Sequence, residues 1–254
     1  MTNILITGAS SGIGAALAGA YADQGNRLVL WGRNAERLAA TATRCRARGA
    51  TVEEDCFDLS DFDRLIAALE TADDRNALDL AILNAGLGGS IPPHRAAQDV
   101  RAAQAMAAVN LTVPVIAANL LAERMARRGR GRIVLVGSVA ANFPLPMAPV
   151  YSGTKAGLTV FADALRLRLE EYGVGITLVS PGFVDTPMSR GLSEPRPFLI
   201  DAEKAATIIV RKVAHGARHI VVPWQFAVIC GAAKLVPGAI VRAILRQVMR
   251  TSAR

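Results

Sequence analysis

The sequence predicts an α/β protein built on one doubly wound, parallel sheet of about seven strands, with helices on both faces. Two patterns predict this class. Short apolar runs alternate along the chain with longer, alanine-rich amphipathic stretches, and the short runs are apolar almost throughout instead of alternating with polar residues. With 254 residues, 52% of them hydrophobic, the chain is long enough for one large core. No repeat or linker interrupts the pattern, so we expect a single domain over residues 1–254.

The expected strands are short and rich in aliphatic residues: Ile4–Thr7, Arg27–Trp31, Thr51–Asp55, Leu78–Leu83, Arg132–Val136, Gly175–Val179 and His219–Val222. The expected helices fill the segments between them: Ile13–Gln24, Ala35–Arg48, Asp61–Thr71, Ala97–Arg127, Val150–Tyr172 and Asp201–His215. Strands that alternate with helices in this way form parallel sheets covered on both faces. Residues 224–254 follow the last strand as an apolar and basic helical extension of the same domain.

The charge of the chain is concentrated at its C-terminal end. There are 29 Lys and Arg against 21 Asp and Glu, but residues 204–254 hold nine basic side chains and no acidic one. The rest of the chain is therefore close to neutral, which argues against a general nucleic-acid-binding surface. We expect no nucleic-acid partner.

The cysteines and the first residues favour a cytoplasmic protein. Cys45, Cys56 and Cys230 are too few and too far apart for a metal cage or a disulfide framework, so we expect reduced thiols and no metal. Thr2–Thr7 is a β-like run that leads directly into glycines, without the basic segment or the cleavage site of a secretion signal.

A glycine-rich turn joins the first expected strand to the first expected helix. Its sequence is Thr7-Gly8-Ala9-Ser10-Ser11-Gly12-Ile13-Gly14. Glycines permit a tight turn and a close approach of a pyrophosphate to the backbone, and a helix N-terminus offers it free N–H groups. The spacing differs from the common Gly-x-Gly-x2-Gly form, and an ordinary turn is the alternative. The strand before it and the helix after it favour a dinucleotide site.

The end of the second expected strand bears on the choice of dinucleotide. Folds that prefer NAD usually place Asp or Glu there, to hold the adenosine 2′-hydroxyl. This chain has Gly32 there, followed by Arg33, whose guanidinium suits a 2′-phosphate, and the Ser10 hydroxyl could add a contact. The sequence therefore predicts NADP(H) in preference to NAD(H), with a solvated loop arginine as the alternative.

Two further turns follow expected strands. Asp58-Leu59 follows the third strand, where it could meet an adenine edge, although Asp58 could instead cap the next helix, as could Ser60 or Asp61. Asn84-Ala85-Gly86 ends the fourth strand, where small residues let the backbone run close to a cofactor.

Asn110 lies inside a long helical stretch, where asparagine is a poor helix former. It either ties neighbouring backbone together or orders a water molecule.

Tyr151 and Lys155 lie four residues apart, and Ser138 follows an apolar strand thirteen residues before the tyrosine. If the segment from Pro149 is helical, the phenol and the ammonium share one face, one turn apart. A neighbouring cation lowers the pKa of a phenol, and a serine hydroxyl can polarise the same substrate oxygen. Each residue alone also suits a surface pair or a turn, but together they can move a proton on and off an alcohol or carbonyl.

These features together resemble the short-chain dehydrogenase/reductase family, in its subgroup of about this length, over residues 3–222. The resemblance rests on the turn Thr7–Gly14, Asn84-Ala85-Gly86, Asn110, Ser138, Tyr151-x3-Lys155 and Pro181-Gly182, all in the same order. It departs at Leu83, where many members carry a second asparagine.

The resemblance implies a Rossmann-type fold and a role for each matched residue. Tyr151 would be the general acid–base, Lys155 would hold the nicotinamide ribose and lower the tyrosine pKa, and Ser138 would bind the substrate oxygen. Asn110 would keep a water molecule in the proton relay. The nicotinamide would lie against Pro181-Gly182, Val184 and Thr186, and the protein would form a homodimer or homotetramer.

Apolar segments beyond the strand ends indicate the substrate side: Leu87–Arg95, Ala140–Pro149 and Phe183–Leu199. They concentrate no charge near the expected chemistry, so a hydrophobic carbonyl compound or alcohol is the expected substrate. The alternatives are a non-catalytic dinucleotide sensor or scaffold, and an isomerase or dehydratase that uses bound cofactor.

The last segment suggests a second kind of contact. Arg242, Arg246, Arg250 and Arg254 recur every four residues, with apolar residues between them. On a helix this pattern gives a basic stripe beside an apolar face, which could dock on anionic lipid at the inner face of a membrane or pack on a partner subunit. A solvated final helix is the third possibility.

Overall fold

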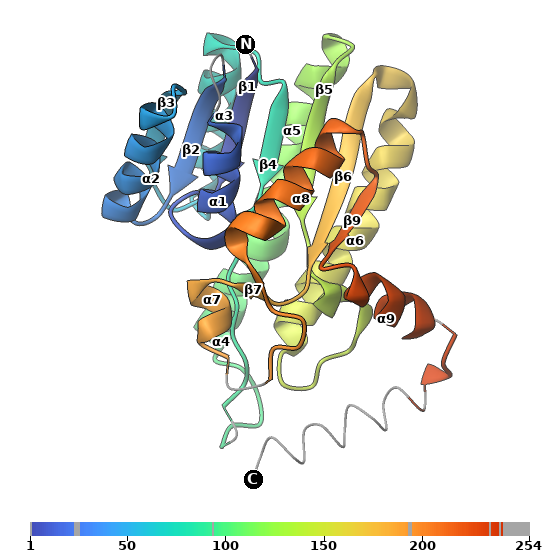
Figure 1. Ribbon diagram of the computed structural model, residues 1–254. Coiled ribbons are helices and arrows are strands. Elements are labelled where there is room, and N and C mark those ends of the chain that lie inside the picture. The colour runs from blue at the N-terminus through green and yellow to red at the C-terminus, as the bar shows by residue number, and fades with distance from the viewer. Residues whose placement is uncertain are drawn as a thin grey trace.

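The computed structural model (Figure 1) describes residues 2–22, 26–92, 94–192, 195–233, 235–238 and 240. Seven strands form one parallel sheet in the order β3-β2-β1-β4-β5-β6-β9. They are β1 (Asn3–Thr7), β2 (Arg27–Gly32), β3 (Thr51–Cys56), β4 (Leu80–Leu83), β5 (Gly131–Val136), β6 (Val174–Pro181) and β9 (His219–Val222). The seven-stranded parallel sheet predicted from the sequence is confirmed, with strand ends shifted by at most two residues.

Helices cover both faces of this sheet (Figure 1). One face packs against α1 (Gly12–Tyr21), α2 (Ala35–Ala47) and α8 (Ala202–Ala214). The other packs against α3 (Phe62–Arg75), α5 (Val113–Arg127) and α6 (Pro149–Leu169). Side chains alternate between these two cores along β1, where Ile4 and Ile6 belong to the first and Leu5 to the second. The predicted doubly wound single domain is therefore correct.

The strand order places a binding crevice at one edge. All pairings are parallel, so the carboxyl ends of the seven strands meet at the same edge. The chain leaves β1 toward β2 and β3 on one side and then returns to β4 on the other side. Ligands bind at such a switch point in open α/β sheets.

The helix expected over Ala97–Arg127 begins later and has three parts. The Asp99 side chain caps α4 (Val100–Ala107) by accepting from the N–H groups of Arg101 and Ala102 at 3.0 and 3.1 Å. A π-helical turn, η1 (Ala108–Thr112), then leads into α5. Val100–Arg127 is the one helical stretch in the described part of the chain that is long and apolar enough to cross a bilayer, but half of its apolar window is buried inside the protein.

Several short elements have no counterpart in the sequence prediction. A two-stranded parallel ladder joins β7 (Val184–Asp185) to β8 (Ile200–Asp201), and α7 (Pro187–Arg190) lies between them. The short helix η2 (Val139–Asn142) was not predicted either, whereas η3 (Glu170–Tyr172) lies within the expected helix Val150–Tyr172 and α9 (Gln225–Ala233) within the expected extension 224–254. The ladder pairs residues far apart in sequence, which no local pattern reveals.

Two predicted segments extend beyond the described residues. The first expected helix reaches Gln24, whereas α1 ends at Tyr21 and residues 23–25 are not described. Of the expected extension 224–254, the structure describes α9 and a few residues up to Ile240. The basic stripe predicted over residues 242–254 lies outside the described residues.

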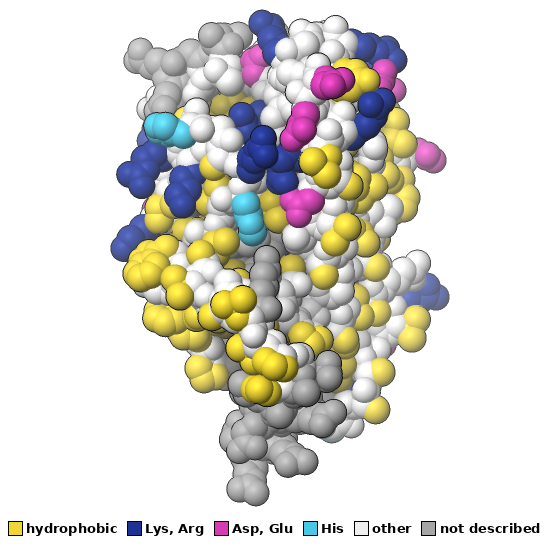
Figure 2. All heavy atoms as spheres, turned by 90° about the vertical axis from the view of Figure 1, so that its right-hand side faces the viewer, with side chains coloured by type: hydrophobic (Ala, Val, Ile, Leu, Met, Phe, Trp, Pro, Cys, Tyr) yellow, Lys and Arg dark blue, Asp and Glu magenta, His cyan; other side chains and the backbone are white. Residues whose placement is uncertain are grey.

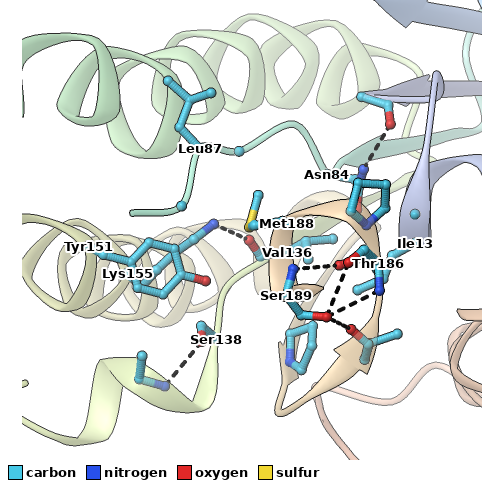
Figure 3. Close-up of a pocket in the computed structure, with 18 of the residues that line it drawn as sticks. Ile13, Asn84, Leu87, Val136, Ser138, Tyr151, Lys155, Thr186, Met188 and Ser189 are labelled. Carbon is cyan, nitrogen blue, oxygen red and sulfur yellow. Dashed lines mark hydrogen bonds between the residues drawn. The ribbon is translucent and has the colours of Figure 1, made fainter. Parts of the chain in front are cut away.

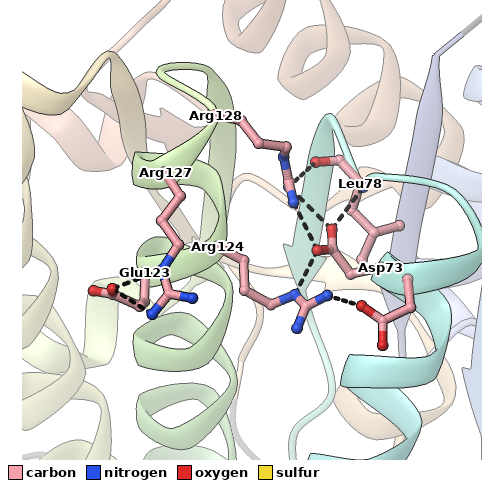
Figure 4. A network of polar contacts seen from close by, with 7 residues as sticks. Asp73, Leu78, Glu123, Arg124, Arg127 and Arg128 are labelled. Carbon is pink, nitrogen blue, oxygen red and sulfur yellow. Dashed lines mark hydrogen bonds and ion pairs between the residues drawn. The ribbon is translucent and has the colours of Figure 1, made fainter.

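A buried carboxylate joins α3 to α5 (Figure 4). Asp73 has a side chain with no exposed surface, and it accepts from the backbone N–H of Leu78 at 2.8 Å. It also accepts from Arg124 Nε at 2.6 Å and from two nitrogens of Arg128 at 2.7 and 3.0 Å. Burial raises the pKa of Asp73, but the hydrogen bonds from Arg128, Arg124 and Leu78 outweigh it and hold the pKa below its ordinary value.

We expect Asp73→Asn to lower the free energy of unfolding by about 3 kcal/mol, because two arginines lose the negative charge that pairs with them and an NH2 donor replaces one of the two acceptor oxygens. The estimate is at the low end for a buried pair because both arginines keep some exposure. Urea unfolding followed by circular dichroism measures it. The wild-type contribution should be lost as the pH falls through the lowered pKa of Asp73.

Asp74→Asn is the matched control, since Asp74 pairs with the same Arg124 from an exposed position. It should cost less than about 1 kcal/mol. Equal losses for the two variants would contradict the central role of Asp73.

Candidate active site

A cleft of about 1020 Å³ lies at the carboxyl edge of the sheet. The sequence-predicted residues that line it are Gly8, Ser10, Ser11, Gly12, Ile13, Arg33, Asp58, Leu59, Asn84, Ala85, Gly86, Ser138, Tyr151, Lys155, Pro181, Gly182, Val184 and Thr186. Two predicted residues, Gly14 and Asn110, do not line it. One cavity therefore brings together residues from most of the chain.

The glycine turn leaves its backbone open to this cleft. Gly8 and Gly12 have φ angles of +69° and +55°, in the left-handed region that glycine favours. A Cβ on Gly8 would lie 2.9 Å from the Cα of Ala85. Gly14 instead faces the backbone of Gly8, so it serves the packing of α1 against the turn and not the cleft wall. The N-terminus of α1, with its free N–H groups, points at the cavity.

Thr7 ties the turn after β1 to the turn after β4. Its Oγ1 accepts from the backbone N–H groups of Asn84 and Ala85 at 3.0 and 3.1 Å. The Asn84 side chain donates back to the Thr7 carbonyl at 3.0 Å. Sequence analysis did not assign this role to Thr7, although the residue opens the glycine-rich motif.

Two arginines, Arg33 and Arg37, line the end of the cleft beside β2. Arg33 follows β2, and Arg37 lies in the first turn of α2, which Asn34 caps by accepting from the Arg37 N–H at 2.8 Å. Ser10 is next to Gly32, where a Cβ would lie 3.2 Å from the Ser10 hydroxyl oxygen. Arg37 was missed because a helical arginine gives no signal by itself. Its spacing of four residues from Arg33 could have indicated it.

Asp58 is held by a turn and not by a helix N-terminus. Its Oδ1 accepts from the N–H and the hydroxyl of Ser60 at 2.9 and 2.8 Å, and these bonds, with Arg33 nearby, lower its pKa. The cap of α3 is Asp61, which accepts from the Arg64 N–H at 3.2 Å. Asp58 therefore does not cap the helix and remains available at the cleft.

The three groups expected to carry the chemistry meet around one corner of the cleft (Figure 3). Tyr151 and Lys155 are one turn apart on α6, and Lys155 Nζ lies 6.0 Å from the centre of the Tyr151 ring. That ammonium donates to the Val136 carbonyl at 2.9 Å. The Ser138 hydroxyl accepts from the Ala140 N–H at 3.1 Å and lies near enough to the Tyr151 phenol to lower its pKa.

Burial controls the pKa of both titratable groups. It raises the pKa of Tyr151, and the hydrogen bond from Ser138 lowers it only in part. It lowers the pKa of Lys155 to about 8. The net shift of the Tyr151 pKa is upward, because desolvation of the phenol outweighs the hydrogen bond from Ser138. The Lys155 ammonium donates to the Val136 carbonyl, and its lowering of the tyrosine pKa stays a prediction.

Asn110 lies behind the cleft wall and fixes the backbone of Leu87, which lines the cleft. It is fully buried in the π-helical turn, where its Oδ1 accepts from the Leu87 N–H at 2.7 Å and its Nδ2 donates to the Leu87 carbonyl at 2.9 Å. Of the two interpretations left open by the sequence, the side chain ties neighbouring backbone together. A Cβ on Gly86 would lie 3.3 Å from Asn110 Oδ1 and 3.6 Å from Lys155 Nζ, so glycine fits between them.

Thr186 lies across the glycine turn. Its methyl carbon would be 3.0 Å from a Cβ on Gly12, and its side chain caps α7 in a reciprocal pair with Ser189, at 3.2 Å in both directions. Because this capping box fixes the residue, the Thr186 backbone and methyl group form part of the wall that faces the turn.

The other end of the cleft is apolar, as the three predicted segments imply. Their contributions include Leu87, Phe143, Leu145, Met147, Phe183, Met188 and Leu192. Met188 contacts Gly88 across the cleft, where an added Cβ would meet its Cγ at 2.8 Å. Phe226 of α9 was missed by sequence analysis. Its ring packs against Gly182 and edge-to-face with Phe183 at 5.9 Å, contacts that no local pattern reveals.

No group of three or more His, Cys, Asp or Glu side chains that could hold a metal ion occurs among the described residues. The three cysteines are all described, and none of them is in a disulfide.

Comparison with known proteins is consistent with this geometry. Residues 2–197 match the short chain dehydrogenase family. The chain belongs to that family. An uncharacterized oxidoreductase of Myxococcus xanthus is 32% identical over 244 residues, which cover 96% of each chain.

Solved short-chain dehydrogenase structures share the fold. One from Sphingobium yanoikuyae, in complex with NADPH, has a TM-score of 0.82 and 27% identity, over 92% of this chain and 94% of that one. The bulky-bulky ketone specific alcohol dehydrogenase from Comamonas testosteroni has a TM-score of 0.78 and 28% identity, over 88% and 86%. The fold and the oxidoreductase family are thus established together.

The lowered pKa of Lys155 gives a pH dependence. We expect Lys155 to be an ammonium below about pH 8 and neutral above it, because burial penalises the charge. Since the unfolded chain holds this proton up to its ordinary pKa of 10.5, the group should increase stability as the pH rises from about 8 toward 10.5. Carbon-13 labelling of the four lysine side chains, followed by NMR, measures the titration.

The NMR signal of Lys155 is assigned as the lysine signal that is missing from the spectrum of the Lys155→Met variant. In urea-unfolded protein the same lysine should titrate near 10.5, which serves as the control. A folded-state titration at that same value would contradict the desolvation argument.

Proposed function

We propose that this protein is an NADP(H)-dependent oxidoreductase that transfers hydride between nicotinamide and the carbonyl or alcohol group of an apolar small molecule. One observation carries the proposal. The Tyr151 phenol, the Ser138 hydroxyl and the Lys155 ammonium line a cleft whose other end is the open glycine turn at the N-terminus of α1. A proton donor and a dinucleotide cradle thus face the same cavity.

The cradle fits a dinucleotide on steric grounds. Side chains at Gly8 and Gly12 would crowd Ala85 and Thr186, whereas glycine leaves the backbone accessible to a diphosphate. Gly8, Ser10, Ser11, Gly12 and Ile13 would hold the diphosphate, and Lys155 with Thr186 would hold the nicotinamide end. When bound, the cofactor supplies or accepts the hydride.

The residues of the chain then handle the proton. In reduction, Tyr151 donates its proton to the substrate oxygen while Ser138 donates a hydrogen bond to the same oxygen. The raised pKa of Tyr151 keeps the phenol protonated at neutral pH, which is the form that reduction needs. Lys155 places a positive charge beside the phenol and stabilises the phenolate left behind.

Arg33 and Arg37 support the choice of NADP(H). Both line the adenosine end, where two guanidinium groups suit a phosphate better than a hydroxyl. The Sphingobium relative was solved with NADPH. The proposal therefore assigns the 2′-phosphate to Arg33, with Arg37 as a second cation.

The apolar end of the cleft supports a hydrophobic substrate. Phe143, Met188 and Phe226 present carbon surface there. The Comamonas relative is described as specific for bulky ketones, which fits a cleft of this size.

We also propose a homodimer or homotetramer in the cytoplasm, and sedimentation velocity tests the oligomeric state.

The two alternatives differ from this proposal in cofactor consumption. A sensor or scaffold needs no buried proton-transfer group, and an isomerase or dehydratase would leave the cofactor pool unchanged. A panel of apolar ketones, followed at the NADPH absorbance band, separates these possibilities. Net consumption of NADPH with any ketone favours the oxidoreductase.

We expect Tyr151→Phe to lower kcat by about 10²–10⁴-fold, because the proton donor is lost while the ring remains. NADPH affinity, measured by fluorescence titration, should be unchanged. Tyr172→Phe is the matched control, since Tyr172 is exposed at the end of α6 and should have no effect. A near-normal rate in Tyr151→Phe would overturn the assigned acid–base role.

We expect Arg33→Asp to weaken NADPH binding by about 10–100-fold, the value of one lost charge-assisted hydrogen bond. NADH binding should change little or improve, because Asp can accept from the ribose hydroxyl. Isothermal titration with both dinucleotides measures the ratio. Arg211→Asp, on the last turn of α8 at the opposite edge of the sheet, makes the same charge change away from the cleft. If Arg33→Asp and Arg211→Asp had equal effects, Arg33 would not be the phosphate ligand.

A further inference from the structure

Helix α9 has apolar residues on both of its faces. Phe226 and Cys230, one turn apart, are buried against the body of the protein. Trp224 and Val228, again one turn apart, point outward and are 68% and 61% exposed. Residues 220–233 contain no charged side chain. A helix that is apolar all round is normally covered on all sides, so the outer face lacks a cover in the single chain.

The exposed apolar surface continues onto the excursion between β7 and β8, which borders the cleft. Phe198 and Met188, both 47% exposed, belong to the excursion between β7 and β8. Phe198 has a φ angle of +57°, which is costly for a bulky residue, and its ring packs edge-to-face on Phe226 at 5.7 Å. The excursion and α9 are thus joined through Phe226, a residue of the cleft wall.

We call this surface the apolar rim and define it by Met188, Phe198, Trp224, Val228, Ile229 and Leu235. Figure 2 shows hydrophobic side chains gathered over the lower part of the face that carries α9, with most charged side chains above them. Met188 and Phe226 line the cleft itself, so the rim borders the apolar end where a substrate would enter.

The charge of the surrounding chain indicates what covers the rim. Residues 204–254 contain nine basic side chains and no acidic one, and in the sequence the last four arginines come after Ile240. A second copy bound through the same part of the chain would bring further basic side chains and no acidic ones. An anionic bilayer offers negative headgroups to the arginines and a hydrocarbon boundary to the side chains, with tryptophan suited to the interface.

We propose that the apolar rim docks on the surface of an anionic lipid bilayer, with the apolar end of the cleft toward the lipid. Resting on the proposed function, this narrows the substrate class to carbonyl compounds or alcohols that dissolve in membranes. Such a molecule would pass from lipid to Phe226 and Met188 with little exposure to water. The contact is peripheral, because the uncharged stretch of α9 is shorter than the roughly 20 residues that span a bilayer.

Vesicle flotation of the full-length protein tests the docking without any substrate. The expected result is binding to phosphatidylcholine vesicles that contain phosphatidylglycerol, weaker binding to pure phosphatidylcholine, and release as salt is raised. The double substitution Trp224→Gln with Val228→Gln should weaken binding by about tenfold or more, because the interfacial aromatic and its neighbour no longer bury apolar surface. Val160→Gln with Leu167→Gln is the matched control, since these α6 residues are both 70% exposed and lie outside the rim.

NADPH titration and sedimentation velocity of each variant, without vesicles, report folding and oligomeric state. Three results would overturn the proposal: no binding of the wild type to anionic vesicles, equal binding by the rim variant, or an oligomer that the rim substitutions dissociate. The third result would assign the rim to a second copy. Vesicle binding by a protein that consumes no NADPH would leave docking standing and remove the proposed function, so the two failures are distinguishable.

Discussion

The close approach of two strand–helix turns is the constraint on which the site depends. The Thr7 hydroxyl holds the backbone of Asn84 and Ala85, and the absence of a side chain at Gly8 lets the turns come together. The chain then runs from Gly86 to Leu87, which Asn110 fixes with two hydrogen bonds. One set of backbone contacts at the switch point of the sheet therefore positions both the glycine turn and the Gly86–Leu87 backbone next to Lys155.

The chemistry of the cleft is governed by desolvation more than by pairing. Lys155 is almost fully buried and its ammonium donates to the Val136 carbonyl, while the neighbouring Tyr151 is partly buried. A charge kept under such conditions is costly, and the cost appears as a lowered pKa for the lysine and a raised one for the tyrosine. A site of this kind stabilises the neutral phenol of Tyr151 and raises the free energy of its phenolate form. Any group that adds hydrogen bonds or positive charge near the phenol changes its acidity strongly.

The sequence was sufficient for those parts of the fold and site that depend on local pattern. Short β-like runs predicted all seven strands, six of them as mostly apolar runs, and 18 of the 20 predicted site residues line the cleft. Contacts between distant segments could not be predicted: the ladder of Val184 with Ile200, the cover of the cleft by Phe226, and the tie between Asn110 and Leu87. The direction of the Tyr151 pKa was also missed, because spacing on a helix shows a neighbouring cation but not the water that folding removes.

The position of Phe226 has a consequence for how the protein forms. The glycine turn lies at the start of the chain and Phe226 near its end, yet both border one cleft. During synthesis the sheet can assemble from β1 to β6 while the wall beside Gly182 is still missing. Contacts between segments that are far apart in the sequence carry the largest loop-closure entropy, and such contacts slow folding. The dinucleotide end of the cleft is thus specified early along the chain, and its apolar end is completed last.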